Sequence, residues 1–136
     1  MNKLKLELVS PERMLVSEEV DEIYVPGSEG DMGILPDHAA LLTSLRAGEF
    51  RYRIGNETEY VAVDGGFLEV KDNKVVVLAD GAELGREINL EEALRRKLEA
   101  ETELEAARHK ESVEQAAIEA ELVRSILRIS VADHYK

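Results

Sequence analysis

The residues of this chain that could do chemistry are three histidines, many carboxylates and a stretch of regularly spaced glycines. The histidines are far apart in the sequence and lack the spacing of metal ligands (His38, His109 and His134). Cysteine is absent, which excludes a disulfide, a thiolate zinc site and a thiol nucleophile. The glycine-rich stretch matches neither the dinucleotide fingerprint nor the phosphate loop. We therefore expect a protein with no active site and no metal of its own.

The glycine-rich stretch is the most distinctive segment, reading Val-Pro-Gly-Ser-Glu-Gly-Asp-Met-Gly-Ile-Leu-Pro-Asp-His over residues 25–38. Glycine recurs at every third position from Gly27 to Gly33, with Pro26 and Pro36 outside. Glycine permits positive φ and proline fixes φ, so we expect a tightly turned polar loop rather than a helix or a regular strand. Such a loop is either a structural turn at a sheet edge or a docking loop that presents its backbone to a partner.

Charge and hydropathy exclude two classes of partner. The formal net charge is −12, whereas nucleic-acid binding needs clustered Lys and Arg, so we expect no nucleic-acid partner. No apolar stretch approaches the roughly 20 residues that span a bilayer. The alternating residues 3–8 do not read as a signal peptide. We expect a soluble chain without direct membrane insertion, which reaches a membrane only through a partner.

Glycine and proline divide the chain in two. All nine glycines and all three prolines lie at or before Gly85, and residues 86–136 contain none. Because helix interiors exclude these residues, the boundary is predicted between residues 82 and 87. Short apolar runs before it predict strands near residues 4–8, 14–16, 20–25, 41–45, 50–54, 59–63, 67–70 and 75–78. Turn signals separate these runs (Gly48, Gly55-Asn56, Asp64-Gly65-Gly66 and Asp72-Asn73). Many short strands favour a sandwich or flattened barrel.

The second part reads as two helices. Asn89 is a good N-cap and Glu92 stands three residues later, which predicts a helix over residues 90–108. A similar capping box, Ser112 followed by Gln115, predicts a second helix over residues 113–129. The connection between them is short, near His109, so the helices should be antiparallel neighbours.

Apolar residues form three stripes on these helices. One lies on the first helix (Ala93, Ala100, Leu104 and Ala107). Small residues on the second helix should let the two helices approach closely (Val113, Ala116, Ala117, Ala120, Val123 and Leu127). A larger stripe should meet the sandwich, another protein, or both in turn (Ile118, Leu122, Ile126 and Ile129). Burying these four residues is worth about 6 to 12 kcal/mol before the entropy cost is subtracted. Docking on the sandwich and docking on a partner could then differ by only a few kcal/mol, so the helices could alternate between the two.

Two motifs in the chain resemble the epsilon subunit of F-type ATP synthases. The first joins a proline–glycine turn, spaced glycines, a histidine and a leucine pair (Pro26-Gly27, Gly30, Gly33-Ile34-Leu35-Pro36, His38 and Leu41-Leu42). The second is Ala-Val-Asp-Gly-Gly-Phe-Leu-Glu-Val at residues 62–70, followed by Val-Val-Val-Leu-Ala-Asp at residues 75–80. The resemblance covers the whole chain, strongly to about Ala82 and more loosely beyond it.

This resemblance implies an α+β fold, with a ten-stranded β-sandwich at residues 1–85 and an antiparallel two-helix hairpin at residues 86–136. It implies a non-catalytic rotor subunit in the central stalk of a proton- or sodium-translocating ATP synthase. The sandwich would connect the gamma subunit to the c-ring and so couple ion-driven rotation to ATP synthesis. The chain would lie at the cytoplasmic face of the bacterial plasma membrane, held there by the complex.

The resemblance also assigns contact residues on the sandwich. The glycine-rich stretch would rest on the c-ring (Gly27, Ser28, Glu29, Gly30, Asp31 and Met32). Asp31 holds the family's acidic position and is expected to pair with a basic or amide group of the ring. The segment after it would face gamma (His38, Ala39, Leu41, Leu42 and Thr43).

The hairpin has three interpretations. It could simply stabilise the sandwich. As a regulatory arm, which the resemblance implies, it would leave the sandwich, extend along gamma and obstruct the alpha/beta catalytic head, slowing ATP hydrolysis. Arg124 and Arg128, one turn apart, would then meet an acidic segment of the beta subunit. Otherwise these two arginines form an exposed basic stripe, which the helix dipole favours near a C-terminus.

The third interpretation is an ATP-sensing module. Some epsilon subunits bind ATP in the folded hairpin through an Ile/Leu-Asp-x-x-Arg-Ala motif. Here Asn89 replaces the aspartate and Glu92 replaces the arginine, which puts a negative charge near the phosphates. We therefore expect no cofactor, or at most weak ATP binding (Ile88, Asn89, Ala93, Arg124 and Arg128). A free-standing sandwich that dimerises through its helices is a further alternative.

Overall fold

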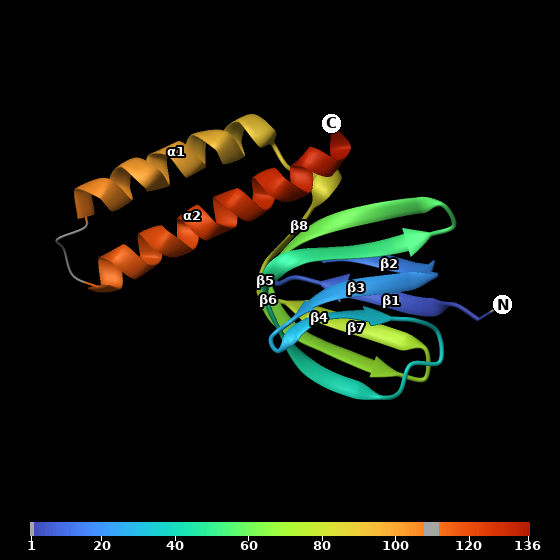
Figure 1. The fold of residues 1–136 in the computed structure, drawn as a ribbon. Coiled ribbons are helices and arrows are strands. Elements are labelled where there is room, and N and C mark those ends of the chain that lie inside the picture. Colours follow the sequence, from blue (N-terminus) through green and yellow to red (C-terminus); the bar gives the residue numbers. More distant parts are fainter. Residues whose placement is uncertain (1, 108–111) are drawn as a thin grey trace. The chain divides into compact units, whose positions relative to one another are not determined.

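Alternating apolar and polar residues build a single sheet from the first part of the chain (Figure 1). The computed structural model describes residues 2–107 and 112–136, in which there are eight strands. They are β1 (Leu4–Val9), β2 (Met14–Val20), β3 (Glu22–Gly27), β4 (Gly30–Ile34), β5 (Leu41–Ile54), β6 (Glu57–Lys71), β7 (Lys74–Ala79) and β8 (Ala82–Leu84). Their order is β2-β1-β7-β6-β5-β3-β4, and β8 pairs with β6. β1 and β7 are parallel, and the other paired strands are antiparallel.

The sheet curves over on itself at the long strands β5 and β6 (Figure 1). Its buried apolar side chains form one core cluster. Leu4, Leu6 and Leu8 of β1 are fully buried, while the residues between them are half-exposed. Every second position of a strand faces the same side, so this alternation places one side in the core. The largest buried side chains of the same core include Phe50 and Tyr52 of β5. The expected sandwich class is therefore confirmed.

The expected number of strands is wrong, because the structure has eight where ten were expected. β5 has 14 residues and β6 has 15, and each is continuous. Each combines two of the predicted short strands, which were expected to be separated by turns at Gly48 in β5 and at residues 64–66 in β6. Counting each long strand twice would give ten. Gly48 and Asp64-Gly65-Gly66 are thus not turns between strands, whereas Gly55-Asn56 and Asp72-Asn73 are.

Residues 64–66 form a bend inside β6 instead of a turn. Gly65 and Gly66 have φ of 94° and 137°, values that L side chains rarely adopt. The pairing register with β5 continues unchanged through the bend, since Leu45 pairs with Gly66 and Ala47 pairs with Asp64. A Cβ on Gly66 would lie 2.2 Å from the carbonyl oxygen of Leu78. Glycine therefore lets β6 bend while remaining tightly paired with β7.

The chain divides into two units, Met1–Gly85 and Arg86–Lys136. The boundary falls within a 3-10 turn, η1 (Gly85–Glu87). The second unit holds α1 (Leu90–Ala107), α2 (Ser112–Ala132) and a final turn, η2 (Asp133–Tyr135). The two helices form an antiparallel hairpin (Figure 1). The predicted end of the first helix at Arg108 and the connection near His109 lie outside the described residues.

The two helices meet on a different face of α2 from the one predicted. On α1 the prediction is confirmed, since Ala93, Ala100 and Ala107 are buried. On α2, Val113 is 80% exposed and Val123 is 56% exposed, so the small-residue stripe faces away from α1. Ion pairs to α1 instead start from Glu121 and Arg128, with buried Ser125 between them. Periodicity alone could not show this, because charged residues line part of the contacting face.

Candidate functional site

The glycine-rich stretch is an antiparallel β-hairpin, which corrects the expectation of a loop without regular strands. β3 and β4 pair from Ile23 with Ile34 to Gly27 with Gly30, and Ser28 and Glu29 form the turn. A Cβ on Gly27 would lie 2.6 Å from the carbonyl oxygen of Gly30, so this turn requires glycine. Ser28, Glu29, Gly30 and Asp31 are exposed, whereas Gly27 is buried and Met32 half-buried. We call residues 27–31 the hairpin tip.

The hairpin tip is fixed to β5 by polar contacts. The backbone N–H of Ser28 donates to the carbonyl oxygen of Ser44 at 3.0 Å, and the two serine hydroxyls are 2.7 Å apart. Asp31 forms an ion pair with Arg46, which the sequence analysis missed because 15 residues separate the two. Asp31 nevertheless remains largely exposed. The tip therefore presents a polar surface on a braced support.

A groove of about 370 Å³ lies beside the hairpin tip. The guanidinium of Arg51 lies 4.4 Å from the centre of the Tyr24 ring within it. Acidic and basic side chains both contribute to its lining (Tyr24, Val25, Pro26, Asp31, Arg46, Ala47, Gly48, Glu49 and Arg51). This balance of charge gives the groove no marked preference for an anion or a cation.

The segment assigned to gamma begins in the loop before β5. His38 is half-buried, and its Nδ1 lies 2.7 Å from the carbonyl oxygen of Ala39, which is exposed. Along β5, Leu42 is 72% exposed, while Leu41 and Thr43 are half-buried. Leu41 packs partly against the core. Of the β5 residues assigned to gamma, Leu42 is therefore the one with an exposed apolar side chain.

An exposed row of apolar residues crosses four strands on the outer face of the sheet, and the sequence analysis missed it. Phe67 pairs with Leu78, Leu78 with Val9, and Val9 with Met14. Phe67, Leu78 and Met14 are each at least half exposed. Leu42 belongs to the same face, because it lies two residues from Ser44, the cross-strand partner of Phe67. We call Met14, Leu42, Phe67 and Leu78 the apolar row. Such exposed patches mark interaction sites.

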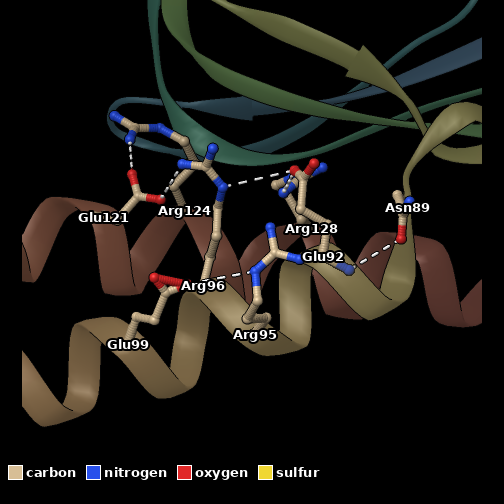
Figure 2. Close-up of polar contacts among 8 residues, drawn as sticks. All are labelled: Asn89, Glu92, Arg95, Arg96, Glu99, Glu121, Arg124 and Arg128. Carbon is tan, nitrogen blue, oxygen red and sulfur yellow. Dashed lines mark hydrogen bonds and ion pairs between the residues drawn. The ribbon is translucent and has the colours of Figure 1, made fainter.

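In the helical hairpin, five side chains of alternating sign run from one helix to the other (Figure 2). Glu92 lies 3.1 Å from Arg128 and 3.6 Å from Arg96. Arg96 lies 3.4 Å from Glu121, which lies 2.5 Å from Arg124. We call this series, Arg128–Glu92–Arg96–Glu121–Arg124, the charge chain. It engages both arginines that the sequence analysis assigned to beta or to ATP.

Asn89 is the N-cap of α1, as predicted. Its Oδ1 accepts a hydrogen bond from the backbone N–H of Glu92 at 2.9 Å (Figure 2). The carboxylate oxygen Oε1 of the same Glu92 lies beside Arg128 and Arg96. Glu92 therefore belongs to both features, through its backbone N–H in the cap and through its carboxylate in the charge chain.

These residues do not fit a nucleotide phosphate. A phosphate at the start of α1 would meet the carboxylate of Glu92, and Arg128 already faces that carboxylate. Ile88, Asn89 and Ala93 supply no cation. Among residues 2–107 and 112–136, no group of three His, Cys, Asp or Glu side chains is arranged to hold a metal ion. No described helix is long and apolar enough to cross a membrane.

Comparison with known proteins identifies the family. The model of the ATP synthase Delta/Epsilon chain β-sandwich domain matches residues 3–85. An ATP synthase epsilon chain of Dehalococcoides mccartyi is 47% identical over 133 residues, which cover 98% of this chain and 94% of that one. One from Carboxydothermus hydrogenoformans is 56% identical over 94 residues, covering 69% of this chain and 70% of that one.

The chain belongs to the ATP synthase epsilon chain family. Solved structures also resemble this epsilon-chain fold. A chain in the Euglena gracilis mitochondrial ATP synthase structure of OSCP, F1 and c-ring has a TM-score of 0.79 at 22% identity, covering 97% of this chain and 81% of that one. A chain in the Tetrahymena thermophila central stalk and c-ring structure has a TM-score of 0.60 at 14% identity, covering 96% and 97%. At these identities the likeness supports the fold alone.

Proposed function

We propose that this epsilon-family chain is a non-catalytic rotor subunit whose sandwich connects the gamma subunit to the c-ring of an F-type ATP synthase. Ser44 carries the argument, because it links two chemically different surfaces. It is the cross-strand partner of Phe67 in the apolar row, and it hydrogen-bonds to Ser28 in the hairpin tip. A subunit that couples ring rotation to ATP synthesis needs two docking surfaces on one rigid support, since torque is lost through flexible chain.

The apolar row suits a protein partner, and we assign it to gamma together with His38, Ala39 and Leu42. Burying an exposed Phe67 or Leu78 against a partner is worth about 1.5–3 kcal/mol for each side chain. Leu41 and Thr43 are half-buried and support this surface from the sheet. An interface of this kind has an apolar centre and a polar rim, and Glu69, the cross-strand neighbour of Leu42, supplies part of such a rim.

The hairpin tip suits the polar loops of a c-ring. Ser28 and Glu29 are exposed at the turn, and the Asp31 carboxylate is exposed although it pairs with Arg46. An exposed ion pair contributes little to stability, so Asp31 can exchange Arg46 for a basic or amide group of the ring at small cost. In this role the chain is held at the membrane surface by the ring, on the cytoplasmic side in a bacterium.

Co-purification with gamma tests the sandwich assignment. Replacing Phe67 and Leu78 by serine should weaken gamma binding without unfolding the sheet, because both side chains point outward. Lys71→Ser removes an exposed side chain from the same strand outside the apolar row, and should bind gamma normally. Equal recovery of gamma with all three chains would exclude the apolar row as its site. A stable homodimer that ignores gamma would instead favour a free-standing module.

The helical hairpin would restrain ATP hydrolysis when it opens and reaches the alpha/beta head. Arg124 and Arg128 are engaged within the charge chain, and the Arg128 side chain is only 12% exposed. Contact with an acidic segment of beta would therefore require the hairpin to open first. We do not propose the alternative ATP-sensing role, because the Glu92 carboxylate beside Arg128 would repel a phosphate.

A further inference from the structure

In the helical hairpin, α1 buries little apolar area. The buried side chains on α1 are the alanines Ala93, Ala100 and Ala107, which each bury little surface. On α2, Ser125 is buried, and its hydroxyl has no hydrogen-bond partner. Two ion pairs of the charge chain join the helices, Glu92 with Arg128 and Arg96 with Glu121 (Figure 2).

Two guanidinium groups from different helices converge on a single oxygen of Glu92. Its Oε1 lies 3.1 Å from Nη1 of Arg128 and 3.6 Å from Nε of Arg96. Paired arginines are the usual receptor for a phosphate or carboxylate oxygen. The Arg128 side chain is 12% exposed, and a guanidinium buried to this degree needs an anion beside it. The carboxylate of Glu92 meets that need from within the chain.

We propose that Glu92 is the resident anion of a cradle formed by Arg96 and Arg128, so that the hairpin closes without a nucleotide. A phosphate-bearing ligand would have to displace the carboxylate and would then be repelled by it. Removing the Glu92 charge should expose a latent anion site that accepts phosphate groups. This inference rests on the hairpin contacts alone and is tested on the isolated full-length chain, so it can fail while the rotor role stands.

Hydrogen exchange of α1 and α2 tests the proposal in the wild type, in Glu92→Gln and in a matched control. Glu91→Gln removes the same charge from the adjacent, exposed position of the same helical turn. We expect Glu92→Gln to speed hairpin exchange about fivefold, the effect of one partly exposed ion pair. Glu91→Gln should exchange like the wild type. Equal exchange in the two variants would overturn the proposal.

Adding inorganic pyrophosphate or magnesium ATP at millimolar concentration tests the cradle itself. We expect neither ligand to slow hairpin exchange in the wild type or in Glu91→Gln. In Glu92→Gln, pyrophosphate should restore part of the lost protection, because the negative charge between Arg96 and Arg128 is then gone. Protection of the wild-type hairpin by ATP, or no response of Glu92→Gln to pyrophosphate, would contradict the proposal.

If Glu92→Gln opens the helical hairpin completely, pyrophosphate binding cannot be tested in it. A double-mutant cycle then tests the contact between Glu92 and Arg128 instead. Glu92→Gln, Arg128→Gln and the double variant are compared by the free energy of hairpin opening measured in increasing denaturant. If the two side chains act on each other, the double variant should open no more readily than the worse single variant. Additive effects of the two changes would show that Glu92 and Arg128 act separately, and would overturn the assignment.

Discussion

Asp37 and Asn73, which are 36 residues apart in the sequence, hold each other through two hydrogen bonds. The backbone N–H of Asp37 donates to Oδ1 of Asn73 at 2.6 Å, and Nδ2 of Asn73 donates to Oδ1 of Asp37 at 3.2 Å. Both residues have positive φ, 70° and 60°, which Asp and Asn tolerate better than most residues. The pair ties the loop that carries His38 to the β6–β7 turn, so the start of the segment assigned to gamma is braced.

Replacing Asn73 by glycine should remove this brace while keeping the positive φ accessible. We expect the sandwich to lose about 1–2 kcal/mol of unfolding free energy, because two hydrogen bonds between loops are lost. Urea unfolding followed by circular dichroism measures this loss. Asn56→Gly alters the exposed turn between β5 and β6 and is the matched control. If the two variants are equally stable, the contact with Asp37 contributes nothing.

Gly66→Ala and Gly30→Ala should separate the cost of a strained backbone from that of a steric clash. Both glycines have φ of 137°. A Cβ on Gly30 would meet nothing within 4 Å, whereas one on Gly66 would lie 2.2 Å from the Leu78 carbonyl oxygen. We expect Gly30→Ala to cost about 1–3 kcal/mol from strain alone. Gly66→Ala should cost at least about 2 kcal/mol more, because overpacking is added. Similar unfolding free energies would show that the bend in β6 can relax.

The Asp21 carboxylate should make the stability of the sandwich depend on pH. Hydrogen bonds from Lys3 and from the backbone N–H of Gly55 lower the pKa of Asp21, with a smaller contribution from nearby Arg53. Because the folded-state pKa is depressed, this stabilisation is complete above the unfolded pKa of about 4 and is lost as pH falls through the folded value.

Asp21→Asn should therefore be less stable than the wild type near neutral pH, and the difference should shrink below about pH 4. Urea unfolding at a series of pH values measures this difference. Lys3→Met should reduce the same pH dependence, because it removes the strongest donor to the carboxylate. A wild type and an Asp21→Asn variant with parallel pH profiles would show that this carboxylate does not contribute.

A chain that ends at Glu87 should test the regulatory hairpin. It keeps all eight described strands and lacks both helices. We expect an ATP synthase complex rebuilt with the shortened chain to hydrolyse ATP faster than one with the full chain, while gamma binding is retained. Steady-state phosphate release measures the rate. Identical rates would remove the inhibitory role and leave the sandwich assignment untouched.

Local sequence patterns determined much of this protein. The alternation of Leu4, Leu6 and Leu8 predicted a strand with one buried side, because neighbouring strand residues face opposite ways. Asn89 marked the start of α1 because its side chain caps the first turn, three residues away. Ala93, Ala100 and Ala107 predicted the contacting face of α1, since a spacing of seven residues returns to the same side of a helix. Each of these signals depends on residues that are close together in the sequence.

Only the tertiary structure decided which distant residues meet. Gly65 and Gly66 look like a turn in the sequence, but pairing with β5 and β7 turns them into a bend within one strand. Arg46 meets Asp31, and Glu92 meets Arg128, through the folding of strands and helices that lie far apart in the sequence. Charged residues carry no periodic signal for such pairing. The face that α2 turns toward α1 was therefore set by packing and ion pairs between the helices, which no local pattern encodes.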